Sequence, residues 1–206
     1  MKEVKEKKKN KQPCNSKKYE LTEETKEWCD VTLHRIRALI DIGDNVKAGD
    51  LGGWVQSEDN LSQYNRCWVY DDAIVLENSI VYGNSIVYGN SIVCGNSYVG
   101  GNSHVYGNSH VYGNSHVYEN SRIGKEANVQ STSDYIVIGP LGSREAFTTF
   151  YLAKNNEIYV TCGCKNTDID TWLGMVKEKH GNNEHGQAYR EAANFARNRF
   201  EKDLKK

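Results

Sequence analysis

The apolar positions between Val69 and Val129 recur with a period of six residues. An aliphatic residue returns at each sixth position, and a small residue stands four places after it. Side chains alternate between the two faces of a strand, so the aliphatic and small residues share one face. The Gly-Asn pairs between them favour turns, because both residues tolerate a positive φ. The aliphatic positions are Val69, Val75, Val81, Val87, Val93, Val99, Val105, Val111, Val117, Ile123 and Val129, and the small positions are Ala73, Ser79, Ser85, Ser91, Ser97, Ser103, Ser109, Ser115, Ser121 and Ala127.

One short strand and one turn in every six residues predict a left-handed parallel β-helix. Three such units close a triangular coil, and each coil forms hydrogen bonds with the coils above and below it. The valines and serines then point into the prism. The expected fold class is mainly β, with a β-helix of hexapeptide repeats over residues 69–130 and a small α+β domain over residues 131–206.

The segments that flank the repeats carry other patterns. Residues 19–68 are expected to form an N-terminal cap and an irregular first coil, with a short helix or strands, because an uncapped coil would leave a free β-edge. The C-terminal part alternates strand and helix patterns, so a small sheet covered by helices is the simplest packing. Its expected strands are 134–139, 147–153 and 157–162, and its expected amphipathic helices are 168–179 and 185–204.

Charge changes the picture only at the N-terminus. Residues 1–20 carry eight lysines and three glutamates, whereas the whole chain has a formal net charge of −1. Residues 1–18 are therefore expected to be a basic disordered tail. No aromatic residue lies among these lysines before Tyr19, so nucleic acid is not an expected partner.

Hydropathy and cysteine usage bear on the cell compartment. No stretch approaches the roughly 20 apolar residues that a membrane-spanning helix needs, and the N-terminus lacks the apolar region of a signal peptide. We therefore expect no membrane partner and a protein of the cytoplasm. The six cysteines should then be thiols or metal ligands rather than a disulfide framework.

The repeat places apolar and aromatic side chains on the outside of the prism. All three faces carry them where a monomer would prefer charge, which is typical of an interface. A homo-oligomer, most simply a trimer packed side by side, is the expected assembly. His104, His110 and His116 fall on three different faces, so one chain cannot bring them to one metal ion. The face expected to line an oligomer interface or groove carries Trp68, Tyr70, Ile86, Tyr88, His104 and Tyr106.

Two sets of residues in the C-terminal part could carry chemistry. Ser143, Arg144, Thr148 and Thr149 combine a glycine turn, hydroxyl groups and a guanidinium fork, which suits an anionic ligand such as a nucleotide. Cys162, Cys164, His180 and His185 are the right residue types for zinc. An ordinary turn with a surface arginine, and buried thiols with helix-end histidines, are the structural alternatives. No other cofactor is expected.

The repeat pattern resembles the hexapeptide β-helix of acyltransferases and gamma-class carbonic anhydrases. A second resemblance covers more of the chain. Several segments are similar to those of β-helix proteins common in bacteriophage and prophage genomes. This resemblance implies a phage origin and the cytoplasm of an infected or lysogenic bacterial host. The residues that carry it are the runs 49–55 (GDLGGWV), 60–62 (NLS), 68–73 (WVYDDA) and 139–144 (GPLGSR), with Cys162-Gly-Cys164.

Three functions remain open at this point. The first is a non-enzymatic, phage-encoded oligomeric binding protein, which could act in counter-defence by sequestering a host signalling nucleotide or by binding a host protein. The second is a hexapeptide-repeat acyltransferase with a histidine as general base, although the repeats contain no inserted loop. The third is a structural scaffold that spaces and oligomerises the C-terminal domain. The pattern favours the first and a protein that is not an enzyme.

Overall fold

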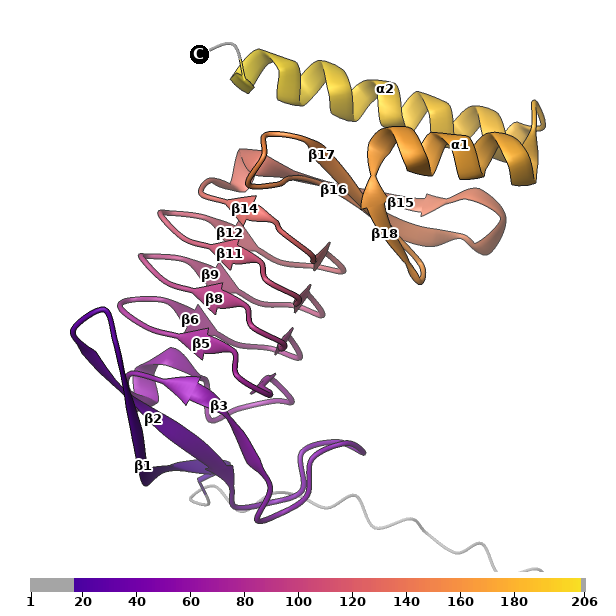
Figure 1. Ribbon diagram of the computed structural model, residues 1–206. Coiled ribbons are helices and arrows are strands. Elements are labelled where there is room, and N and C mark those ends of the chain that lie inside the picture. Colours follow the sequence, from indigo (N-terminus) through magenta and orange to yellow (C-terminus); the bar gives the residue numbers. More distant parts are fainter. Residues whose placement is uncertain (1–16, 205–206) are drawn as a thin grey trace, which may run out of the picture.

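The computed structural model describes residues 17–204 and shows a β-helix with a β-stranded cap at its N-terminal end and a small domain at its C-terminal end (Figure 1). The predicted basic tail lies outside the described residues apart from Lys17 and Lys18. Lys18 corrects the predicted boundary of that tail, because it is buried and belongs to the fold. Its Nζ donates to the carbonyl oxygen of Cys67 at 2.9 Å, so its charge is solvated by the backbone of the first coil.

The β-helix is built from two-residue strands, each contributed by one hexapeptide. They stack in parallel into three sheets, which are the three faces of the prism. The first face contains β4 (Trp68–Val69), β7 (Ile86–Val87), β10 (His104–Val105) and β13 (Arg122–Ile123). The second contains β5 (Ile74–Val75), β8 (Ile92–Val93), β11 (His110–Val111) and β14 (Asn128–Val129), and the third contains β6 (Ile80–Val81), β9 (Tyr98–Val99) and β12 (His116–Val117). The predicted β-helix of hexapeptide repeats and the predicted strand register are confirmed.

The side chains at the aliphatic and small positions of each hexapeptide fill the interior of the prism. The valines are fully buried, and six of the eight buried serines donate their hydroxyl to a backbone carbonyl group. Ser79 Oγ, for example, donates to the carbonyl oxygen of Leu76 at 2.6 Å and lies 3.0 Å from that of Val93. The serine thereby satisfies carbonyl groups at the turn that would otherwise be buried without a partner. The hydroxyls of Ser115 and Ser121, in the last coils, have no hydrogen-bond partner among the described residues.

The turns take their shape from one residue of each Gly-Asn pair. The glycine adopts a positive φ, as at Gly107 with φ 73°, and the asparagine does not. The asparagines instead form ladders along the prism, in which Asn78 donates to Asn96 at 3.0 Å and Asn96 donates to Asn114 at 3.1 Å.

The N-terminal cap consists of strands and one short helix. Strands β1 (Tyr19–Trp28) and β2 (Val31–Ala38) form an antiparallel hairpin, and β3 (Leu51–Val55) joins β2 to β5, followed by the short 3-10 helix η1 (Glu58–Asn60). The cap therefore extends the second face of the prism as one continuous sheet. Tyr19 packs edge-on against Trp68 with ring centroids 6.2 Å apart, and it covers that outward-facing side chain.

The C-terminal domain is a four-stranded antiparallel sheet with two helices on one side (Figure 1). Three strands and both helices agree with the predicted segments to within a few residues, whereas β18 was not predicted. The apolar sides of both helices pack on the sheet around Phe150 and Val160. The elements are η2 (Thr132–Asp134), β15 (Tyr135–Leu141), η3 (Gly142–Arg144), β16 (Ala146–Leu152), β17 (Ile158–Cys162), β18 (Lys165–Asp168), α1 (Ile169–His180) and α2 (Glu184–Leu204).

Polar contacts join the last coils to this domain. The hydroxyl of Tyr106, which directly follows β10, accepts a hydrogen bond from Asn166 Nδ2 at 2.8 Å, and Asn166 also donates to Thr161 at 2.9 Å. An antiparallel bridge between Ala127 and Ala153 continues the backbone pairing across the junction. Within residues 17–204, no helix combines the length and apolar character needed to cross a membrane.

Candidate functional site

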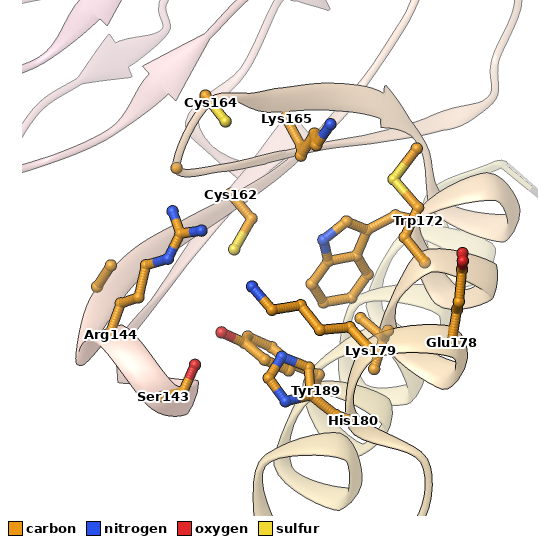
Figure 2. A pocket seen from close by; sticks show the side chains of 14 residues that line it. Ser143, Arg144, Cys162, Cys164, Lys165, Trp172, Glu178, Lys179, His180 and Tyr189 are labelled. Atoms are coloured by element: carbon orange, nitrogen blue, oxygen red, sulfur yellow. The ribbon is translucent and has the colours of Figure 1, made fainter.

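A cavity of about 410 Å³ lies in the C-terminal domain, between the sheet and the two helices. One wall is η3, another is the turn between β17 and β18, and the remainder comes from α1 and α2 (Figure 2). This volume lies within the range of about 300–1,000 Å³ that is usual for small-molecule sites. Its lining includes Ser143, Arg144, Cys162, Cys164, Lys165, Trp172, Met175, Val176, Glu178, Lys179, His180 and Tyr189.

The wall formed by η3 depends on a glycine. Gly142 has a φ of 71°, and a side chain there would collide with the phenol ring of Tyr189 on α2. This close approach sets the η3 turn directly on α2 and leaves Ser143 and Arg144 exposed at the mouth of the cavity. Glycine fits both requirements, because it lacks a Cβ and accepts a positive φ at no steric cost.

The opposite wall is the first helix. Asp168 caps its N-terminus by accepting a hydrogen bond from the backbone N–H of Thr171 at 2.8 Å, and this bond lowers the pKa of the Asp168 carboxyl group. The helix buries Trp172 and Val176 against the sheet. Its last turn then presents Lys179 and His180 to the cavity, as Figure 2 shows.

Three cationic side chains converge on the cavity without partners of their own. Among the side chains that the structure describes, those of residues 17–201, Arg144, Lys165 and Lys179 make no ion pair and no side-chain hydrogen bond. Only Glu178 adds a negative charge to the lining. The site is thus locally positive in a chain whose formal net charge is −1.

Two titratable side chains with rings, His180 and Tyr189, also line the cavity. Partial burial lowers the pKa of His180, and the neighbouring charge of Lys179 lowers it further, so the imidazole is neutral at neutral pH. Burial raises the pKa of Tyr189, and the adjacent Cys162 sulfur raises it as well. Tyr189 is therefore a neutral hydroxyl that can donate or accept a hydrogen bond.

The structure brings together most residues of the two predicted sets. Ser143 and Arg144 from one set, and Cys162, Cys164 and His180 from the other, line the same cavity. Sequence reasoning missed Lys165, Lys179, Trp172 and Tyr189 as members of the site. The spacing of apolar residues in the two predicted helices indicated that Trp172 and Tyr189 are buried. No local pattern indicated that they border this cavity.

Three predicted site residues lie elsewhere. Thr148 and Thr149 are buried in β16 and do not line the cavity. Thr149 Oγ1 accepts a hydrogen bond from the backbone N–H of Arg122 at 3.0 Å, which ties the sheet to the β-helix. His185 lies just outside the lining, with its ring 6.0 Å from that of His180. Alternating side chains on a strand explain why one face of β16 is buried against the β-helix and the other against the helices.

Zinc at Cys162, Cys164, His180 and His185 stays a prediction. Within the part of the chain that the structure describes, no group of three or more His, Cys, Asp or Glu side chains is gathered closely enough to hold a metal ion. The two cysteines and His180 border one cavity, yet they do not converge on a single point.

The predicted interface face of the β-helix is only partly open. Trp68 is 1% exposed beneath the N-terminal hairpin, so it is not available on the surface. Tyr88 and Tyr106 stack with ring centroids 5.1 Å apart, and His104 meets Tyr88 edge-on. As predicted, the three histidines lie on separate faces, on β10, β11 and β12. The most exposed tyrosines of the prism are Tyr82, Tyr98 and Tyr118, which all lie on or beside the third face.

Comparison with known proteins gives one local likeness. No protein-family model matches the chain. Over 67 residues it is 36% identical to the uncharacterized acetyltransferase YdcK of Escherichia coli (strain K12), a match that covers 29% of this chain and 20% of that protein. The chain therefore spans about a fifth of the length of this curated relative. The likeness agrees with a hexapeptide-repeat β-helix.

Proposed function

We propose that the protein binds a small anionic ligand in the cavity of its C-terminal domain and that the β-helix serves as the scaffold for this domain. The observation that carries the proposal is the convergence of Arg144, Lys165 and Lys179 on one cavity without protein partners. An arginine fork and two ammonium groups suit phosphate or carboxylate oxygens. Each cation stays solvated until a ligand arrives, so binding need not break an existing ion pair.

The remaining lining residues suit a ligand that also has an uncharged part. Trp172, Met175 and Val176 form an apolar floor, while Ser143 and Tyr189 offer hydroxyl groups. Ligand sites of this kind combine apolar walls with a few polar groups that fix orientation. A nucleotide fits this description, and capture of a host signalling nucleotide by a phage protein is the biological setting that the sequence suggested. In that setting the protein binds and releases its ligand unchanged.

The test uses the whole protein and isothermal titration calorimetry with ADP and with inorganic pyrophosphate as separate probes. Arg144→Ala and Lys179→Ala should each weaken binding about tenfold or more, because a hydrogen bond to a charged group contributes roughly 1.5–3 kcal/mol. Lys177→Ala is the matched control. Lys177 is an exposed lysine on the same helix that does not line the cavity, so its removal should leave the affinity unchanged.

Two results would contradict the proposal. One is the absence of any heat of binding for either probe at millimolar concentration. The other is equal weakening by Lys177→Ala and Lys179→Ala, which would mean that the helix attracts anions without a defined site. Binding of pyrophosphate but not ADP would keep the anion site and remove the nucleotide from the proposal.

A second candidate function, acyl transfer, is favoured by the likeness to the acetyltransferase YdcK. A general base would have to come from the outer histidines of the prism. His104 and His110 both have lowered pKa values, mainly through partial burial, so they are neutral bases at neutral pH. Thiol release from acetyl-CoA, followed in the wild type and in His104→Asn, His110→Asn and His116→Asn, tests this function. Turnover that one of these changes abolishes would establish an enzyme and displace the binding proposal.

A further inference from the structure

Two cysteines lie at the tip of the hairpin that forms one wall of the cavity. Strand β17 ends at Cys162 and β18 begins at Lys165, and these two residues are register partners. Gly163 and Cys164 are therefore the two residues of the turn. Gly163 has a φ of 60° and Cys164 has a negative φ, which is the arrangement of a type II′ turn with glycine at its first central position.

The turn brings the Cα atoms of the two cysteines within the span that a disulfide can bridge. Residues two apart are separated by at most about 7 Å when the chain is fully extended, and a turn shortens this span. A disulfide needs Cα atoms about 4.4–6.8 Å apart. Joining the sulfur atoms then requires rotation of the two side chains and an adjustment of the turn.

Both thiols can be reached from the cavity. Cys162 is half-buried with its sulfur directed into the cavity, and Cys164 is exposed at the rim (Figure 2). The cations Arg144, Lys165 and Lys179 surround them, which favours the approach of an anionic thiol reagent such as glutathione disulfide. The other described thiols lie outside this domain: Cys67 and Cys94 in the β-helix, and Cys29 at the tip of the N-terminal hairpin.

We infer that Cys162 and Cys164 are a reversible dithiol–disulfide pair whose substrate is a low-molecular-weight disulfide. The exposed thiolate of Cys164 attacks one sulfur of glutathione disulfide, forms a mixed disulfide and releases one glutathione. The thiolate of Cys162 then attacks Cys164 Sγ, forms the internal disulfide and releases the second glutathione. Two electrons pass from the cysteines to the glutathione disulfide, and the two thiol protons end on the two glutathione molecules.

This pair is independent of the proposed anionic ligand, since the exchange needs only the hairpin and its two thiols. It also differs from the zinc site suggested by the sequence, because cysteines joined in a disulfide have no thiolate to offer a metal ion. Closure would draw the Cys164 side chain from the rim towards Cys162 and change the wall of the cavity. The redox state of the two cysteines would thereby change the affinity of the cavity for its ligand.

The experiment equilibrates the full-length protein in glutathione buffers from fully reduced to fully oxidised. Free thiols are then alkylated, and tryptic peptides are analysed by mass spectrometry. Cleavage after Lys154 and Lys165 yields the peptide 155–165, which contains both cysteines and no other. We expect this peptide to lose the mass of two hydrogens as the buffer becomes oxidising and to regain it on reduction.

Single variants distinguish the internal bond from unspecific oxidation. Cys162→Ser and Cys164→Ser should each retain a glutathione adduct on the remaining cysteine, because no second thiol is present to release it. Cys29→Ser is the matched control and should leave the internal disulfide unchanged. The inference is overturned if the wild type collects glutathione adducts at both cysteines without the internal bond. It is equally overturned if both thiols stay alkylatable in oxidised buffer, or if stoichiometric zinc protects them.

Discussion

The guanidinium group of Arg122, on the last strand of one β-helix face, donates a hydrogen bond to the carbonyl oxygen of Gly163 at 3.2 Å. Gly163 is in the turn between β17 and β18, so a residue of the prism holds one wall of the cavity. The same residue's backbone N–H donates to Thr149. The β-helix is therefore attached to the C-terminal domain at the hairpin that carries Cys162 and Cys164.

Removal of this side chain should loosen the wall of the cavity. We expect Arg122→Ala to lower the free energy of unfolding by about 0.5–1.5 kcal/mol, the usual contribution of one hydrogen bond, and to weaken pyrophosphate binding severalfold. Urea unfolding and calorimetry measure the two effects. Arg66→Ala, at an exposed arginine near the other end of the prism, should change neither. Equal effects of the two variants would contradict a specific role for the Arg122 contact.

The glycines of the prism turns should resist substitution. Gly107 has a φ of 73°, and a Cβ there would lie 2.8 Å from the backbone nitrogen of Lys125 in the next coil. Gly107→Ala should therefore lower the free energy of unfolding by about 1–3 kcal/mol. Gly174→Ala is the matched control, because Gly174 is in the middle of α1 with open space around it. This second change should stabilise the protein by roughly 0.5–1 kcal/mol, and a loss of stability there would contradict the account.

Stability should fall in mild acid. His104, His110 and His180 have folded-state pKa values below the ordinary value of 6.5, mainly because partial burial disfavours the imidazolium. The unfolded chain then binds more protons than the folded chain near and below pH 6.5, so stability is fully present above that pH and is lost as the pH falls below it. Thermal unfolding from neutral pH to pH 5 measures the loss. His104→Gln should lose less stability over this range than the wild type, and an unchanged slope would remove His104 from the explanation.

Self-association also stays a prediction, and native mass spectrometry of the purified protein tests it. The sequence favoured a trimer through the face of Trp68, but Trp68 is buried, whereas Tyr98 and Tyr118 are 37% and 45% exposed on or beside the third face. If the exposed tyrosines are the contact, Tyr98→Lys should dissociate an oligomer that Tyr88→Lys leaves intact. The opposite pattern would restore the face originally expected, and a monomeric wild type would remove both.

Much of the fold was accessible from the sequence because its signals are local. The six-residue period, the buried serine and the turn glycine repeat along the chain, so each coil can be assigned from its own residues. The spacing of Trp172 with Val176, and of Ala193 with Ala196, similarly indicated the buried sides of the two C-terminal helices. The hairpin of the N-terminal cap was missed because β1 carries mostly charged and polar residues, and its pairing with β2 satisfies backbone groups rather than a local apolar pattern.

The sequence by itself determined the architecture of the prism, the assignment of the three histidines to different faces and the choice of Arg144, Cys162 and Cys164 as residues of interest. Only the tertiary structure decided that these three share one cavity with Lys165 and Lys179 and that Tyr19 covers Trp68. The physical reason is the range of the interactions. Strand alternation and turn conformation depend on neighbours in the chain, whereas a cavity wall depends on how η3, a hairpin tip and two helices pack against one another.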